Sequence, residues 1–109
     1  MNNTFQIFQL KDREDIDRDL LFTHYDTLCK MGREVEKKNY NKIWEQSLTI
    51  EGSAEEILEE LFYIFNMERP KEFKGHSLSV SDVIILNKDG HESYYYTDSI
   101  GFKRLSKFC

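Results

Sequence analysis

The residues most capable of chemistry lie close together, between positions 75 and 82. Three alternate serines stand there between a histidine and an aspartate: His76, Ser77, Ser79, Ser81 and Asp82. A histidine oriented by a carboxylate can act as general base toward a serine nucleophile. The spacing argues against this chemistry, because residues six apart in an extended chain are separated by ~20 Å, at ~3.3 Å per residue. The chain also lacks the G-x-S-x-G turn that frames many nucleophilic serines. We therefore expect no catalytic residue in this segment.

The same segment suits a structural role. Leu78 and Val80 alternate with the serines, and this period of two predicts a half-buried strand edge. Ser81 and Asp82 can hydrogen-bond the local backbone and start a buried strand over residues 83–86. Gly75 is expected to supply backbone freedom before it.

The strongest predicted element is a helix beginning after Ser53. Ser53 and Glu56 form a capping box, S-x-x-E, just before the apolar pattern. Five apolar residues recur on one helical face: Ile57, Leu58, Leu61, Phe62 and Phe65. Four acidic residues lie away from that face: Glu55, Glu56, Glu59 and Glu60.

A hairpin is predicted in the last third of the chain. Asp89 and Gly90 form a type I′ turn pair between two runs of strand-forming residues. This turn sets three cross-strand pairs: Val83 with Tyr96, Ile84 with Tyr95, and Ile85 with Tyr94.

Weaker patterns predict the remaining elements. Strands are expected over residues 5–10 and within 39–50, and a short helix over 23–32 with Thr23 as N-cap and Gly32 just after its end. The C-terminal residues turn at Gly101 and close the fold. We therefore predict a single α+β domain over residues 1–109, a mostly antiparallel sheet with one strong amphipathic helix and a shorter one.

Charge and length limit the classes of partner. The 109 residues carry 15 basic and 20 acidic side chains, a net charge of −5, without the basic face that nucleic-acid binding needs. We expect no direct nucleic-acid binding. No stretch reaches the ~18 apolar residues of a membrane span, and the N-terminal residues do not resemble a secretory signal. These features predict a cytoplasmic protein without membrane contact.

Metal and cofactor binding are not expected. The possible ligands, His24, His76, His91, Cys29 and Cys109, include no C-x-x-C or H-x-x-x-H pair. Cys29 shares one face of the short predicted helix with Tyr25 and Leu28, at i, i+3 and i+4, which favours a thiol in the core.

The segment "FKGHSLSVSDVIIL", followed by "YYYTDSIGF", resembles the signature of the YodL-type domain family. The upstream pieces "LLFTHYDTL", "NYNKIWEQSL" and "EEILEELFYIFN" fit the same family in the same order, so the resemblance covers roughly residues 5–108. The family-defining residues are Gly75, His76, Ser77, Ser79, Ser81, Asp82, Asp98, Gly101 and Phe102. The family has no agreed enzymatic activity, and its members resemble passengers of Firmicutes plasmids, phages and integrative elements.

The resemblance implies a non-enzymatic antagonist of host defence, by analogy with other small acidic proteins of mobile elements. The expected partner is a defence protein with a basic nucleic-acid channel, and the leading candidate is a type II CRISPR effector nuclease, Cas9. The expected partner-binding residues are Asp15, Asp17, Glu55, Glu56, Glu59, Glu60 and Tyr95. Two alternatives stay open: a small nuclease-like enzyme that uses His76 and Asp82, and a modulator of host growth or cell shape.

Overall fold

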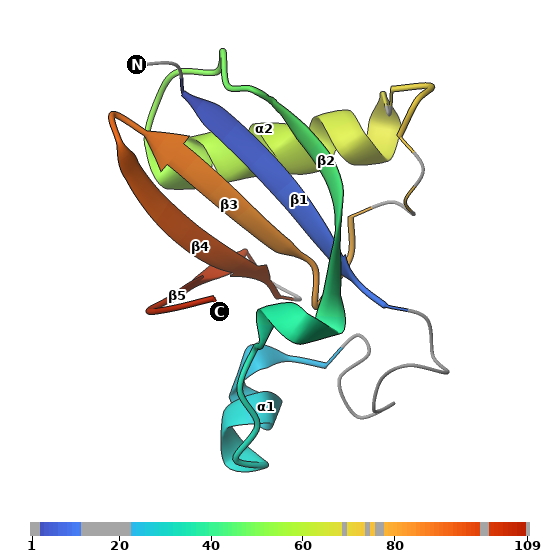
Figure 1. Cartoon of the computed structure of the whole chain (residues 1–109), viewed down its shortest axis with the longest axis vertical. Coiled ribbons are helices and arrows are strands. Elements are labelled where there is room, and N and C mark those ends of the chain that lie inside the picture. The colour runs from blue at the N-terminus through green and yellow to red at the C-terminus, as the bar shows by residue number, and fades with distance from the viewer. Residues whose placement is uncertain are drawn as a thin grey trace.

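A five-stranded antiparallel sheet with one long helix across a face forms the body of the computed structural model (Figure 1). The structure describes residues 3–11, 23–68, 70–73, 75, 78–98 and 101–108. The elements are β1 (Thr4–Leu10), α1 (Tyr25–Lys30), the 3₁₀ turn η2 (Lys37–Asn39), β2 (Tyr40–Ser47), α2 (Ala54–Met67), β3 (Val83–Lys88), β4 (His91–Thr97) and β5 (Phe102–Leu105). The strand order is β2-β1-β3-β4-β5. The predicted α+β class is confirmed.

Each face of the sheet is covered by an apolar cluster. Because successive side chains of a strand point to opposite faces, β3 supplies both clusters from one uninterrupted apolar run. On the α2 face, the buried residues include Phe5, Ile7, Ile84, Leu86, Leu61 and Phe65. On the α1 face, they include Phe8, Leu28, Tyr40, Val83, Tyr96 and Phe108. Figure 1 shows α2 crossing behind the strands, with α1 and η2 at one end of the molecule.

Helix α2 begins as the sequence predicts. The Ser53 hydroxyl accepts a hydrogen bond from the Glu56 N–H (3.2 Å), and a Glu56 carboxylate oxygen accepts one from the Ser53 N–H (3.1 Å). The bond from the Ser53 N–H lowers the pKa of Glu56. Phe62 departs from the prediction, because it is 36% exposed at the margin of the apolar face and meets Phe102 edge-on.

The β3–β4 hairpin has the predicted turn and register. Asp89 and Gly90 both have positive φ, +53° and +83°, as a type I′ turn requires. The strand pairs are those expected: Val83 with Tyr96, Ile84 with Tyr95, and Ile85 with Tyr94.

Helix α1 is shorter than predicted. It is preceded by His24 as N-cap residue, one position after the expected Thr23, and no side chain caps it. Gly32 follows its end with φ +71°, as expected. Leu28 is the buried residue of α1. The Cys29 thiol is exposed, so the prediction of a thiol in the core is wrong.

Candidate functional site

Residues 78–82, which we call the serine turn, form a turn and not the predicted strand edge. The Asp82 N–H donates to the Ser79 carbonyl (3.1 Å), and the Asp82 carboxylate accepts from the Ser79 N–H (3.0 Å). Ser81 has φ +89°, far from extended backbone. The alternation with Leu78 and Val80 misleads, because the aspartate offers the backbone a local acceptor that competes with strand pairing.

The serine turn is fixed by partners from three strands. The Gln9 side-chain amide donates to the Asp82 carboxylate (3.1 Å), and the Tyr40 hydroxyl donates to the Ser81 carbonyl (2.7 Å). The Ser81 N–H donates to the Thr97 carbonyl (2.9 Å), and the Thr97 N–H donates to the Asp82 carbonyl (2.8 Å). Gln9, Ser81, Asp82 and Thr97 are each at most 3% exposed. These bonds join the end of β1, the start of β2 and the end of β4 at the start of β3.

Gly75 lies against this group for a steric reason. A Cβ there would collide with the Gln9 amide oxygen and come within 2.8 Å of an Ile43 methyl group. Its φ does not lie in the left-handed region, so close approach and not backbone freedom requires glycine here. The prediction named the right residue and the wrong cause.

The proposed catalytic pair is only half described. His76 and Ser77 lie outside the described residues. Asp82 is 1% exposed, and its carboxylate accepts hydrogen bonds from the Gln9 side-chain amide and the Ser79 N–H. A carboxylate held in this way is suited to fixing the start of a strand.

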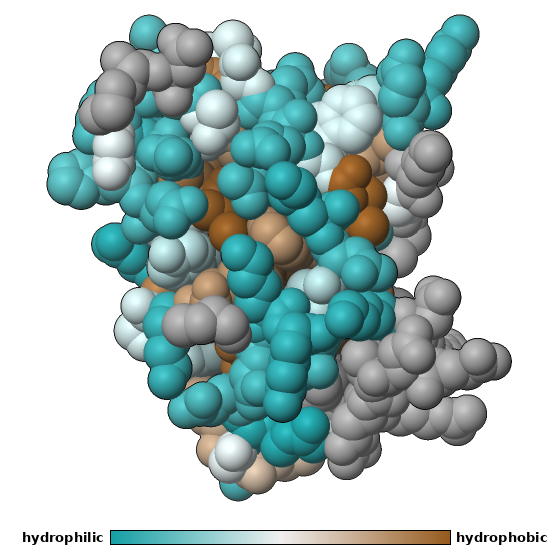
Figure 2. All heavy atoms as spheres, viewed as in Figure 1, coloured by the Kyte–Doolittle hydropathy of each residue, from teal (hydrophilic) through white to brown (hydrophobic). Residues whose placement is uncertain are grey.

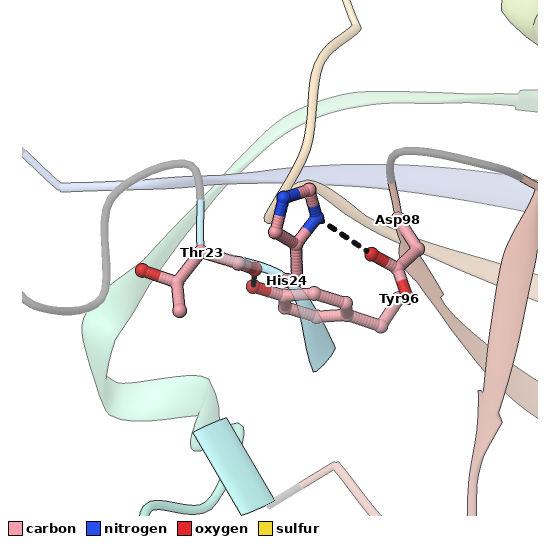
Figure 3. Close-up of polar contacts among 4 residues, drawn as sticks. All are labelled: Thr23, His24, Tyr96 and Asp98. Carbon is pink, nitrogen blue, oxygen red and sulfur yellow. Dashed lines mark hydrogen bonds and ion pairs between the residues drawn. The ribbon is translucent and has the colours of Figure 1, made fainter. Parts of the chain in front are cut away.

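A second polar group joins α1 to the end of β4 (Figure 3). The His24 Nδ1 lies 3.4 Å from the Asp98 carboxylate, and their side chains are 59% and 9% exposed. The Tyr96 hydroxyl donates to the Thr23 carbonyl (2.6 Å). Burial, followed by the nearby carboxylates of Asp98 and Asp82, raises the pKa of Tyr96.

This second group could orient an imidazole as a general base, but neither nearby hydroxyl is placed as its nucleophile, because the Tyr96 hydroxyl donates to the Thr23 carbonyl. Figure 3 shows the Thr23 side chain directed away from the imidazole. Sequence analysis identified His24 only as a possible metal ligand, because nothing local signals its pairing with Asp98, 74 residues away. The arrangement holds the segment before α1 against the sheet.

The described residues bring no three possible metal ligands together. Neither described helix has the length and apolar character needed to cross a bilayer. Cys109 lies outside the described residues.

A surface groove runs between α2 and the edge strand β5, and we call it the helix–edge groove. One hollow of about 270 Å³ is lined by Ala54, Glu55, Leu58, Tyr95, Phe102 and Arg104. A second, of about 280 Å³, is lined by Glu59, Phe62, Asp98, Gly101 and Phe102. Phe102 lines both.

The predicted partner-binding residues fall in different environments. Tyr95 is only 8% exposed and packs in the α2-face cluster, where it also lines the first hollow. Glu55, Glu56, Glu59 and Glu60 are all exposed on α2, as expected. Glu56 is also engaged in the capping box. Asp15 and Asp17 lie outside the described residues.

The side opposite α2 carries a hollow of about 240 Å³, between α1 and the end of β5. Figure 2 shows that this face is mostly hydrophilic, with small separate apolar areas over the strands. Part of it is bridged by polar side chains, such as Gln6 and Lys42, which both bond Glu45.

Comparison with known proteins gives one match. The family model described as a YodL-like domain matches residues 4–108. No curated protein and no solved structure matches the chain. Because the family model spans nearly the whole length, the chain belongs to the YodL-like domain family.

Proposed function

We propose that this chain acts by binding another protein, as a non-enzymatic antagonist of host defence carried by a mobile genetic element. The partner is a defence protein with a basic nucleic-acid channel, and the leading candidate is a Cas9-type nuclease. The observation that supports this proposal is the acidic outer face of α2, where Glu55, Glu59 and Glu60 are exposed. None of the ion pairs within the described part of the chain involves them.

The division of labour among the polar residues supports binding over catalysis. Most of the described family-defining residues are occupied in the serine turn or its supports, and Asp82 is buried there. Apart from Glu56 in its capping box, the α2 glutamates are not held by such bonds within the described residues. Unpaired surface carboxylates attract a basic surface, and such attraction increases the rate of encounter.

The channel of a nuclease is a suitable target for this surface. A channel that holds nucleic acid is lined with Lys and Arg, whose counterparts are normally phosphates. Glu55 and Glu59 lie one helical turn apart, so their carboxylates form a short row on one side of α2. Such a row can occupy part of the space that a nucleic-acid backbone fills.

The proposal is tested by measuring association with purified Cas9. Replacing Glu55 and Glu59 together by Lys should slow association about tenfold, because steering by surface charge contributes 10-fold or more to on-rates. Binding of the unchanged protein should also weaken with added salt. Kinetics from biolayer interferometry, with melting curves to confirm folding, supply both measurements.

Charge-matched controls make the test specific. Replacing Asp26 and Glu51, which are exposed elsewhere, by Lys changes net charge equally. Equal slowing by both double variants would mean that net charge alone, and not the position of Glu55 and Glu59, causes the effect. Asp15→Lys with Asp17→Lys examines the other predicted acidic segment. His76→Ala should leave nuclease inhibition unchanged, and a tenfold loss with an unaltered melting curve would favour an enzyme instead.

A further inference from the structure

We propose that the helix–edge groove binds a basic segment of the partner protein, with apolar side chains of that segment inserted on either side of Phe102. This inference rests on the proposed protein-binding function and specifies the chemistry of the bound segment. It adds an apolar anchor to a surface that the sequence suggested only as an acidic one.

The walls of the groove are apolar at their base. Leu58, Tyr95 and Phe102 line the first hollow, and Phe62 and Phe102 line the second. Phe62 stands at the margin of α2, 36% exposed, with its ring edge-on to Phe102 at 6.2 Å between centroids. Exposed aromatic side chains beside a hollow are the residues that most often anchor a protein partner.

The size of the hollows favours side chains over a small-molecule ligand. Each is about 270 to 280 Å³, just below the ~300–1,000 Å³ typical of small-molecule pockets. Two adjacent hollows that share one wall, Phe102, suit two side chains of one chain segment.

The charges around the groove select a basic segment. Glu55 and Glu59 stand on the α2 side, and Arg104 is the one base among the described lining residues. Asp98 adds a third carboxylate, although it is 9% exposed and close to His24. Because like charges across an interface cost free energy and opposite charges fix its register, the acidic excess favours Lys or Arg near the inserted side chains.

The strand that borders the groove is also accessible from one side. β5 is the last strand of the sheet order and pairs with β4 alone. A segment seated in the groove therefore lies next to a sheet edge, where neighbouring backbone can be reached.

The test uses the full chain and a fluorescent synthetic peptide, rich in lysine and carrying two leucines, followed by anisotropy. The unchanged protein should bind it, and Phe62→Ala should weaken binding about tenfold, equivalent to ~1.4 kcal/mol. Tyr63→Ala is the matched control, because Tyr63 is 52% exposed on the same helix and lines neither hollow. The same peptide with serines in place of leucines should bind more weakly and respond equally to both variants.

A charge pair provides an independent measurement should Phe62→Ala perturb folding. Glu59 lines the second hollow and Glu60 lines neither. Glu59→Lys should therefore weaken peptide binding more than Glu60→Lys. Equal effects within both pairs, or no binding of the lysine–leucine peptide, would overturn the proposal. Loss of a self-associated form in Phe62→Ala, measured by sedimentation, would overturn it in favour of a second copy of the chain.

The two proposals can fail separately. Peptide binding that depends on Phe62, without any binding to Cas9, would retain the groove and reject the target. Binding to Cas9 that weakens on reversal of Glu55 and Glu59 but is unaffected by Phe62→Ala would retain the acidic surface and reject the apolar anchor.

Discussion

The serine turn and the helix–edge groove use polar residues in opposite ways. In the serine turn, Asp82 and Ser81 are buried and bonded to Gln9, Tyr40 and Thr97. In the groove, glutamates are exposed beside aromatic rings. Four of the described family-defining residues, Gly75, Ser79, Ser81 and Asp82, belong to the serine turn or lie against it. Three others, Asp98, Gly101 and Phe102, line the groove, together with residues that are common on any amphipathic helix.

The difference follows from the free energy of burying polar groups. A buried carboxylate needs several matched donors, so each position around it is restricted in residue type. An exposed glutamate remains hydrated and restricts its neighbours little. A distinctive motif can therefore mark a structural requirement, and the exposed glutamates of a binding surface can leave little signature in the sequence.

The largest expected effect compares the two faces of α2. Replacing Leu61, which is 1% exposed in the core, by Ala should lower the free energy of unfolding by ~2–5 kcal/mol. Glu59→Ala, on the groove side, should change it by less than ~0.5 kcal/mol. Urea denaturation measures both. Similar losses would mean that the groove side of α2 is also structural, and the contrast between the two regions would disappear.

Elements with local signals were predictable from the sequence. The capping box of Ser53 and Glu56 and the turn of Asp89 and Gly90 use residues that bond or bend within a few positions. They place α2 and the β3–β4 hairpin, and the apolar run of β3 indicates a strand buried on both faces. The α+β fold follows from these elements.

Features that depend on distant partners were not predictable. The serine turn needs Gln9 and Tyr40, 73 and 41 residues from their partners in it. The groove depends on how β5 lies beside α2. The side chain of Tyr95 lies on the opposite face of the sheet from those of Tyr94 and Tyr96, as strand alternation requires, yet it is buried because α2 covers that face. No periodicity in one segment contains this information.

The next prediction concerns the centre of the serine turn. Asp82→Ala removes the acceptor of a buried hydrogen bond from the Gln9 amide and of a partly buried one from the Ser79 N–H. Leaving a buried donor unsatisfied costs ~1–3 kcal/mol, so the midpoint of urea denaturation should fall accordingly.

Two comparisons sharpen this result. Glu51→Ala, an acid exposed before α2, should leave the midpoint unchanged. If the folded Asp82→Ala variant instead retained full stability and lost only activity, the serine turn would be a functional site, contrary to its assigned role.

The smallest expected effect concerns one hydroxyl and its dependence on pH. Tyr40→Phe removes the bond to the Ser81 carbonyl but keeps the ring, which packs edge-on against Phe108. At neutral pH the variant should be less stable by ~1 kcal/mol, the net contribution of one hydrogen bond. Burial, with nearby Tyr96 and Asp82, raises the pKa of Tyr40 above the 10.0 of a free tyrosine. The folded state therefore holds this proton more tightly than the unfolded state.

A raised pKa gives stability that is complete below about pH 10 and declines as pH rises above it, because the unfolded tyrosine ionises first. Tyr40→Phe lacks this term, so the gap between the two proteins should narrow as urea denaturation is repeated from about pH 8 to 11. Tyr96, whose pKa is also raised, contributes to the decline of stability with rising pH in both proteins. Tyr63→Phe, on an exposed side chain, is the control and should follow the unchanged protein throughout. A gap that stays constant with pH would show that Tyr40 reaches solvent, and the serine turn would then be more open than its hydrogen bonds indicate.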